Sequence, residues 1–281
     1  MSVTSAVTGV APPAHSVPPG LTVAVLALLL SIQPVTTDLY LPALPVLTQS
    51  LGAAVSAAQL TLSALLLAFG MSQLVWGPLS DRFGRRPVLL AGLGMYAVAA
   101  LGSALAPSMD WLIVWRTAQG AAMGAVVMSA RAIVRDLYTP LTGARAMSKA
   151  LTGLGVIAFL CAPVGGALTE WLGWRSALLA VAVYGVLVLA LVALRMPETL
   201  THKNPQALQP AVLARNWRLV LGHPAFWAFS LLTTATYGGL FTFLASSSFV
   251  FIEVLGVTRT QYGWIMASAC AAYFAGTFVC R

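Results

Sequence analysis

Long apolar runs separated by short polar segments dominate this sequence and limit the folds that it can adopt. The clearest pair of runs flanks residues 77–86 (GPLSDRFGRR), with about twenty apolar-rich residues on each side of this charged stretch. A helix needs about 18 or more apolar residues to cross a hydrocarbon core ~30 Å thick. Residues 77–86 are therefore predicted to form a very short turn between two spanning helices, with Gly77, Pro78 and Gly84 allowing the tight bend.

Composition extends this prediction to the whole chain. Of its 281 residues, 59% are hydrophobic and only 8% are charged, whereas about a quarter of the residues of a soluble domain are charged. The predicted fold class is therefore an all-α polytopic membrane protein. The net charge of +8 is better explained by basic loops on one side of a membrane than by a nucleic-acid partner. The sequence contains no zinc-protease or serine-nucleophile motif, so it predicts no enzyme, no cofactor and no metal site.

Eight spanning helices and a polar linker are predicted from the apolar runs. The runs lie at about 21–41, 57–79, 87–106, 111–131, 150–168, 175–194, 223–245 and 261–279. Residues 1–20 are predicted to be a disordered tail, and residues 196–222 a polar segment between the sixth and seventh helices.

The distribution of basic residues predicts the orientation in the membrane. One set of loops and helix ends holds Arg82, Arg85, Arg86, Arg131, Arg135, Arg145, Lys149, Arg195, Lys203, Arg215 and Arg218. The opposite set holds only Arg175 and Arg259. Because Lys and Arg accumulate in cytoplasmic loops, this bias predicts that the first set and the N-terminus are cytoplasmic.

The charged stretch also resembles the signature loop between helices 2 and 3 of the major facilitator superfamily of secondary transporters. The residues at the spacing of that signature are Gly77, Asp81, Arg82, Gly84, Arg85 and Arg86. The resemblance implies a six-helix N-terminal half (21–195), a central cytoplasmic linker (196–222) and the first two helices of a C-terminal half (223–281). Since each half of such a transporter has six helices, it also implies a chain truncated after its eighth helix.

Two ionisable residues fall inside predicted spans, Asp38 in the first and Arg116 in the fourth. A charge at the middle of a bilayer costs ~2.5–3.5 kcal/mol on insertion scales, and such residues usually have a function. Asp38 comes roughly 26 Å along the first helix and Arg116 roughly 8 Å along the antiparallel fourth helix. Both are therefore expected in the outer leaflet, facing one cavity. The alternatives are that Asp38 caps a helix at the outer interface and that Arg116 makes a structural ion pair or binds carbonyl groups.

A narrower resemblance concerns the surroundings of these two residues. Residues 38–45 (DLYLPALP) and 249–253 (FVFIE) are similar to the Bcr/CflA family of drug/proton antiporters. Residues 116–124 (RTAQGAAMG) resemble the helix 4 motif of the superfamily. The resemblance implies that Asp38 carries a proton and that Arg116 influences its protonation, since a nearby cation lowers the pKa of a carboxyl group and loss of hydration raises it.

Glycines mark two places where helices are expected to approach closely. Gly120 and Gly124 are separated by three residues, and close helix packing is favoured over substrate contact as their role. Residues 162–166 (APVGG) resemble the end of the helix 5 motif of antiporters, G-P-x-x-G-G, which implies export. In this segment Pro163 is expected to kink the helix, while Gly165 and Gly166 admit a neighbouring helix. The alternative is an ordinary kinked membrane helix, because Ala162 stands where the motif has glycine.

The charged turn is expected to act as a conformational latch. Asp81 is expected to accept hydrogen bonds from a helix N-terminus in the other half. One of the arginines at 82, 85 and 86 is expected to pair with Asp136 at the end of the fourth helix. The candidate residues of an adaptable substrate cavity, for each of which core packing is the alternative, are Tyr40, Gln119, Met123, Tyr237 and Phe241.

The sequence thus predicts a proton-coupled exporter of small, mostly apolar compounds that works by alternating access in a bacterial inner membrane. Its predicted partners are the lipid bilayer, protons and a drug-like substrate. The alternative prediction is a truncated membrane protein that inserts but carries nothing, or that needs a partner to supply the missing helices.

Overall fold

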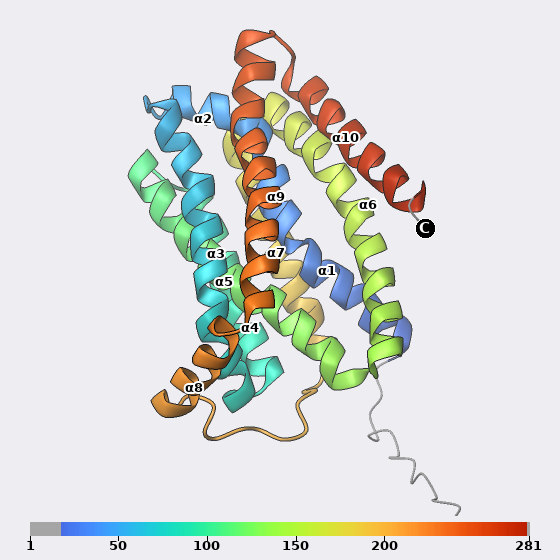
Figure 1. Ribbon diagram of the computed structural model, residues 1–281. Coiled ribbons are helices and arrows are strands. Elements are labelled where there is room, and N and C mark those ends of the chain that lie inside the picture. Colours follow the sequence, from blue (N-terminus) through green and yellow to red (C-terminus); the bar gives the residue numbers. More distant parts are fainter. Residues whose placement is uncertain (1–17, 280–281) are drawn as a thin grey trace, which may run out of the picture.

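Helices make up most of the computed structural model, which describes residues 18–279, and no strand occurs in this range. Figure 1 shows them as one bundle of long rods with shorter helices at its two ends. The elements in chain order are α1 (Pro19–Asp38), the 3₁₀ turn η1 (Leu41–Ala43), α2 (Leu44–Ser50), α3 (Val55–Phe83), α4 (Arg85–Ala104), α5 (Met109–Leu137), α6 (Pro140–Leu172), α7 (Trp174–Arg195), α8 (Pro210–Leu221), α9 (Pro224–Phe249), the π-helical turn η2 (Val250–Val254) and α10 (Arg259–Val279). Most of the predicted disordered tail, residues 1–17, and the chain end at 280–281 lie outside the described residues.

Long helices lie at all eight positions predicted for spans. Within the described residues, six helical stretches are long and apolar enough to cross a bilayer, namely Gly20–Ser50, Val55–Phe83, Arg85–Ala104, Pro140–Leu172, Trp174–Arg195 and Pro224–Val254. The fourth and eighth positions are filled by α5 and α10, which fall outside this set. α5 carries Arg116 and Gln119 in its first half, and these polar side chains lower its mean hydropathy.

The predicted turn at residues 77–86 is wrong in its extent. α3 continues through Gly77 and Pro78 to Phe83, and α4 begins at Arg85, so Gly84 alone connects the two helices. Its φ of +114° is a conformation that residues with a Cβ rarely adopt. A proline inside a spanning helix is tolerated because neighbouring groups satisfy the backbone oxygen that it frees.

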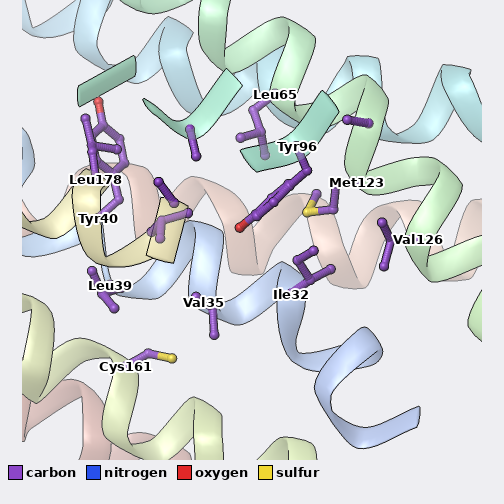
Figure 2. Close-up of a cluster of buried hydrophobic side chains, with 14 of the residues drawn as sticks. Ile32, Val35, Leu39, Tyr40, Leu65, Tyr96, Met123, Val126, Cys161 and Leu178 are labelled. Carbon is purple, nitrogen blue, oxygen red and sulfur yellow. The ribbon is translucent and has the colours of Figure 1, made fainter. Parts of the chain in front are cut away.

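Small residues bring α5 against α3. A Cβ on Gly120 would collide with the backbone of Leu65, and a Cβ on Gly124 would collide with the side chain of Ser72. The close packing expected for this glycine pair is therefore what the two helices show. The buried cluster beside it includes Ile32 of α1 (Figure 2).

The C-terminal helices pack unequally on the rest of the bundle. α10 lies along α6, where a Cβ on Gly263 would meet the carbonyl oxygen of Ala162 at 2.5 Å. α9 instead exposes nearly every residue between Phe226 and Phe243 in the described part of the chain. The predicted polar linker also contains a helix, α8, in which no residue is buried.

Candidate functional site

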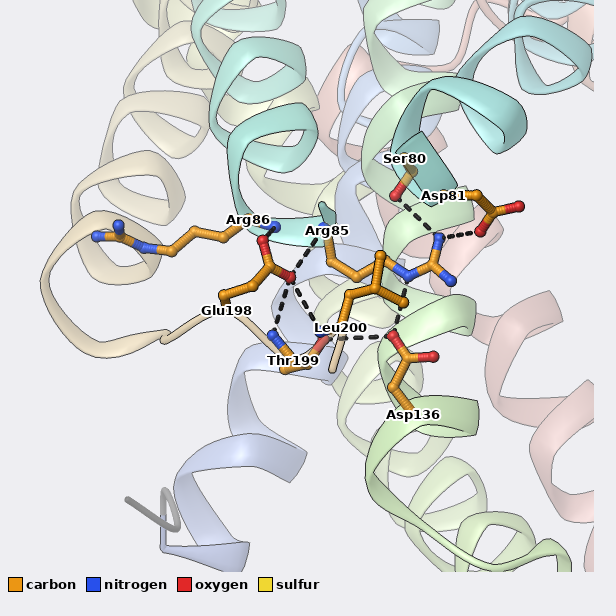
Figure 3. A network of polar contacts seen from close by, with 8 residues as sticks. All are labelled: Ser80, Asp81, Arg85, Arg86, Asp136, Glu198, Thr199 and Leu200. Atoms are coloured by element: carbon orange, nitrogen blue, oxygen red, sulfur yellow. Dashed lines mark hydrogen bonds and ion pairs between the residues drawn. The ribbon is translucent and has the colours of Figure 1, made fainter. Parts of the chain in front are cut away.

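The charged cluster at the α3–α4 connection is centred on the side chain of Arg85, which is only 8% exposed. Its guanidinium donates to Asp81 Oδ1 at 2.6 Å, to Asp136 Oδ2 at 2.9 Å and to Ser80 Oγ at 3.1 Å (Figure 3). Three elements therefore meet at one cation: the end of α3, the start of α4 and the end of α5. Of the three arginines proposed as partners of Asp136, the structure selects Arg85.

The other residues of the charged cluster point elsewhere. Arg86 donates to the carbonyl oxygen of Ala193 at the end of α7, at 2.9 Å. The guanidinium of Arg82 lies over the ring of Phe83, 5.5 Å from its centroid. A Cβ on Gly77 would meet no atom within 4 Å in the described residues, so packing does not explain that glycine.

A carboxylate that sequence reasoning did not single out completes this cluster. Glu198, in the segment after α7, accepts hydrogen bonds from the backbone N–H of Arg85 at 2.9 Å and from that of Arg86 at 3.2 Å (Figure 3). These are the first two residues of α4, whose N–H groups have no partner within the helix. The only signal in the sequence was an acid in a segment otherwise rich in proline and polar residues.

Asp38 is the last residue of α1, where the helix gives way to the 3₁₀ turn. Its Oδ1 accepts a hydrogen bond from Thr37 Oγ1 at 2.7 Å. The turn η1, which follows Asp38, packs against both α6 and α10. Asp38 therefore lies close to the meeting point of α1, α6 and α10.

Arg116 does not form an ion pair with Asp38. The two ion pairs among the described residues both belong to Arg85. The fully buried Arg116 side chain donates to the carbonyl oxygen of Thr36 at 3.2 Å and to Gln119 Oε1 at 2.9 Å, and its guanidinium lies 4.3 Å from the centroid of the Tyr40 ring. This carbonyl-binding arrangement is one of the alternatives drawn from the sequence. It attaches Arg116 to one residue before Asp38 and to one residue after it.

The helix 5 motif lies at the same junction as Asp38. A Cβ on Gly165 would collide with the carbonyl oxygen of Leu39, the residue that follows Asp38. A Cβ on Gly166 would collide with the carbonyl oxygen of Arg259, at the start of α10. Pro163 faces α10 as well, because its Cα lies 2.7 Å from the position of a Cβ on Gly263. The motif thus lets α6 approach both α1 and α10.

A cavity of about 260 Å³ lies between α3 and α9, bounded by the end of α1. Its lining residues are Thr37, Leu41, Gln59, Leu62, Ser63, Leu66, Gly238, Phe241, Thr242, Leu244, Ala245 and Ser246. Of the five predicted cavity residues, only Phe241 is among them. Tyr237 stacks on Phe241 with ring centroids 6.2 Å apart. Tyr40, Gln119 and Met123 are instead fully buried in the helix core.

Tyr40 has a structural role in that core. Its hydroxyl pairs with Thr61 Oγ1 of α3 at 3.0 Å, and its ring faces the Arg116 guanidinium. Neither contact leaves the side chain open to the cavity. Substrate contact by Tyr40, Gln119 or Met123 would therefore require a conformation other than this one.

Comparison with known proteins agrees with this architecture. The family model of the Major Facilitator Superfamily matches residues 26–281. The chain is 34% identical over 250 residues to a chloramphenicol resistance protein of Pseudomonas aeruginosa, covering 87% of this chain and 58% of that protein. It is 30% identical over 240 residues to a bicyclomycin resistance protein homolog of Haemophilus influenzae, covering 85% of this chain and 60% of that protein.

Solved structures agree on the fold. A bacterial homolog to the human lysosomal transporter Spinster, in an inward-facing and unoccupied conformation, superposes with a TM-score of 0.73 at 20% identity, over 94% of this chain and 62% of that chain. The present chain thus spans about 60% of the length of the curated relatives that it matches. The all-α helical bundle, the cluster at residues 77–86 and the family match lead to one conclusion: the chain is a multi-pass membrane protein that belongs to the Major Facilitator Superfamily, a family of transporters and not of enzymes.

Proposed function

We propose that the chain is a proton-coupled transporter that exports small, mostly apolar drug-like compounds by alternating access. The observation that carries this proposal is the position of Asp38 at the end of α1. Its carboxylate has no cationic partner among the described residues and accepts one hydrogen bond, from Thr37. Asp38 is partly buried. A carboxyl group that loses water without gaining such a partner can avoid the cost of a desolvated charge by binding a proton.

The position of Asp38 also suggests how a proton would be coupled to substrate. Thr37 and Leu41, which flank Asp38 along the chain, both line the cavity between α3 and α9. Loss or gain of a proton at Asp38 would change the hydrogen bond from Thr37, and so alter the cavity wall. Arg116 would act on this step indirectly, by holding the backbone of Thr36 and the ring of Tyr40.

Contacts at the end of the molecule away from Gly84 support alternating access. Glu170 at the end of α6 accepts hydrogen bonds from the N–H of Thr260 at 3.1 Å and from its hydroxyl at 2.6 Å. Gln49 of α2 donates to Glu253 of η2 at 3.2 Å. Both contacts join the first seven helices to the later ones, and both would have to break when this end opens. From the basic residues, we infer that this end faces away from the cytoplasm of a bacterial inner membrane, and that the N-terminus is cytoplasmic.

The relatives named for chloramphenicol and bicyclomycin resistance support drug-like compounds as the substrate class. The test is the accumulation of chloramphenicol in cells that express the chain, with membrane insertion verified. Export predicts lower accumulation than in cells without the chain, and it predicts that an uncoupler of the proton gradient abolishes this difference. Unchanged accumulation would contradict independent export by this chain.

A second candidate is a membrane protein that transports only when further helices complete it. The exposure of α9 from Phe226 to Phe243 favours this reading, because a spanning helix with so little helix packing has an unoccupied face. Co-expression with the C-terminal half of the Pseudomonas aeruginosa relative tests it. Export in cells that express both parts, with none in cells that express the chain by itself, would establish this second function.

A further inference from the structure

The segment that follows α7 is attached to the charged cluster through one carboxylate, that of Glu198. Besides the N–H groups of Arg85 and Arg86, it accepts the N–H of Thr199 at 2.9 Å and the N–H of Leu200 at 3.0 Å. One side chain thus satisfies four backbone donors, two from the start of α4 and two from the segment itself. Figure 3 shows the carboxylate between these two backbones.

The start of α4 is shaped to receive this carboxylate. A Cβ on Gly84 would collide with Glu198 Oε2. An anion at this position also interacts favourably with the positive end of the helix dipole. The absence of a side chain at Gly84 therefore has two consequences: it permits the φ of +114° between α3 and α4, and it leaves room for Glu198.

Two further contacts fix the same segment to the partners of Arg85. Thr199 Oγ1 donates to Asp136 Oδ2 at 3.4 Å, the oxygen that also accepts from Arg85 Nε. The N–H of Asn204 donates to the carbonyl oxygen of Asp81 at 2.9 Å. Residues 198–204 thus contact both acidic residues that hold the Arg85 guanidinium, Asp136 through its carboxylate and Asp81 through its backbone carbonyl.

We propose that Glu198 is a positioning residue that clasps residues 198–204 onto the charged cluster and thereby sets Arg85 between Asp81 and Asp136. The first part of the linker between α7 and α9, residues 198–204, is then fixed to the charged cluster. Displacement between the first seven helices and α9 must be taken up by residues 205–222, which include α8. Movement that pulls on residues 198–204 would act directly on the cluster around Arg85. This inference concerns the cluster and does not depend on the substrate or on proton coupling.

The first test is amide hydrogen exchange in the purified full chain, as native protein and as Glu198→Ala. Loss of the carboxylate is expected to speed exchange by ten-fold or more at the start of α4 and at residues 199–200. The matched control is Glu170→Ala, which removes a carboxylate that caps α10 in the same manner at the other end of the molecule. That variant is expected to speed exchange at Thr260 and to leave Arg85 and Arg86 unchanged. Equal exchange at Arg85 and Arg86 in Glu198→Ala and native protein would overturn the clasp.

The second test separates positioning of Arg85 from simple capping of α4. Melting temperatures are compared for native protein, Glu198→Gln, Asp136→Asn and the double variant. If Glu198 sets Arg85 against Asp136, the effects of the two substitutions on the melting temperature are not additive. The decrease caused by Asp136→Asn is then expected to be at least halved in a chain that already carries Glu198→Gln. Additive decreases would show that Glu198 only caps the helix and would overturn the positioning role. The pair Glu170→Gln and Asp136→Asn, far apart in the structure, is expected to be additive.

Discussion

The guanidinium of Arg116 lies over the ring of Tyr40, 4.3 Å from its centroid, and not against a carboxylate. The same side chain donates to the carbonyl oxygen of Thr36. Residues on both sides of Asp38 are thereby attached to α5. Arg116 is thus suited to hold the end of α1 in place while Asp38 remains free of an ion pair.

This contact predicts the effect of replacing Arg116. A desolvated cation–π contact is worth about 2 kcal/mol, and a hydrogen bond from a charged group about 1.5–3 kcal/mol. Arg116→Lys keeps the charge but not the planar group, and it is expected to lower the free energy of unfolding by about 2–4 kcal/mol. Thermal melting in detergent measures this loss. The control is Arg175→Lys, since Arg175 lies 4.2 Å from the Trp174 ring centroid but is exposed. Equal stability losses in the two variants would contradict the account of Arg116.

The two acids beside Arg85 are predicted to differ in importance. The Asp136 side chain is 16% exposed and the Asp81 side chain 50%. Asp136→Asn is expected to cost about 1–3 kcal/mol, because it leaves a buried cation with a weaker acceptor. Asp81→Asn is expected to cost less than about 1 kcal/mol, as for most solvated ion pairs. Chemical denaturation of both variants gives the comparison, and a larger loss in Asp81→Asn would refute this ranking.

The close approach of α5 to α3 predicts the outcome of adding one methyl group. Gly120→Ala is expected to destabilise the protein by about 1–3 kcal/mol, because the new Cβ would collide with the backbone of Leu65. Gly94→Ala in α4 is the control, since a Cβ there meets nothing within 4 Å. The control is expected to be neutral or slightly stabilising, as helix propensity favours alanine. Thermal melting of both variants measures the difference, and equal melting temperatures would show that the helices do not pack as described.

The proposed orientation predicts which positions are accessible from outside the cell. Asp110→Cys at the start of α5 is expected to react with a membrane-impermeant maleimide in intact cells. Thr139→Cys, between α5 and α6, is expected to react only after permeabilisation. Both are introduced into a chain whose native cysteines are replaced by serine. The reverse labelling pattern would show that the chain has the opposite orientation in the membrane.

The positions of the helices could be predicted from the sequence, because an apolar run of about 20 residues has few alternatives to a spanning helix. The turn at residues 77–86 was predicted less well. Gly77 and Pro78 mark turns in soluble proteins, but here they remain inside α3, and the chain reverses at Gly84 alone. The positive φ of that residue depends on how α3 and α4 pack, which no local pattern reveals.

Candidate site residues could be proposed from the sequence, but their contacts could not. Counting along the helices places Asp38 and Arg116 at similar depth, but depth does not determine the direction in which a side chain points. Asp38 comes where α1 ends, next to a turn that packs on α6 and α10, and it forms no ion pair with Arg116. Glu198 was missed for another reason: it lies 113 residues beyond Arg85 along the chain, so only the tertiary fold brings the two together.

The central claim, proton coupling at Asp38, is tested most directly by proton movement in proteoliposomes after addition of chloramphenicol. The assay compares the native chain with Asp38→Asn and with Asp110→Asn, a control acid in the first turn of α5, after folding is verified for all three. We predict a pH change in the native chain and in Asp110→Asn, and none in Asp38→Asn. A pH change of the same size in Asp38→Asn would show that the proton is carried elsewhere and would contradict the account.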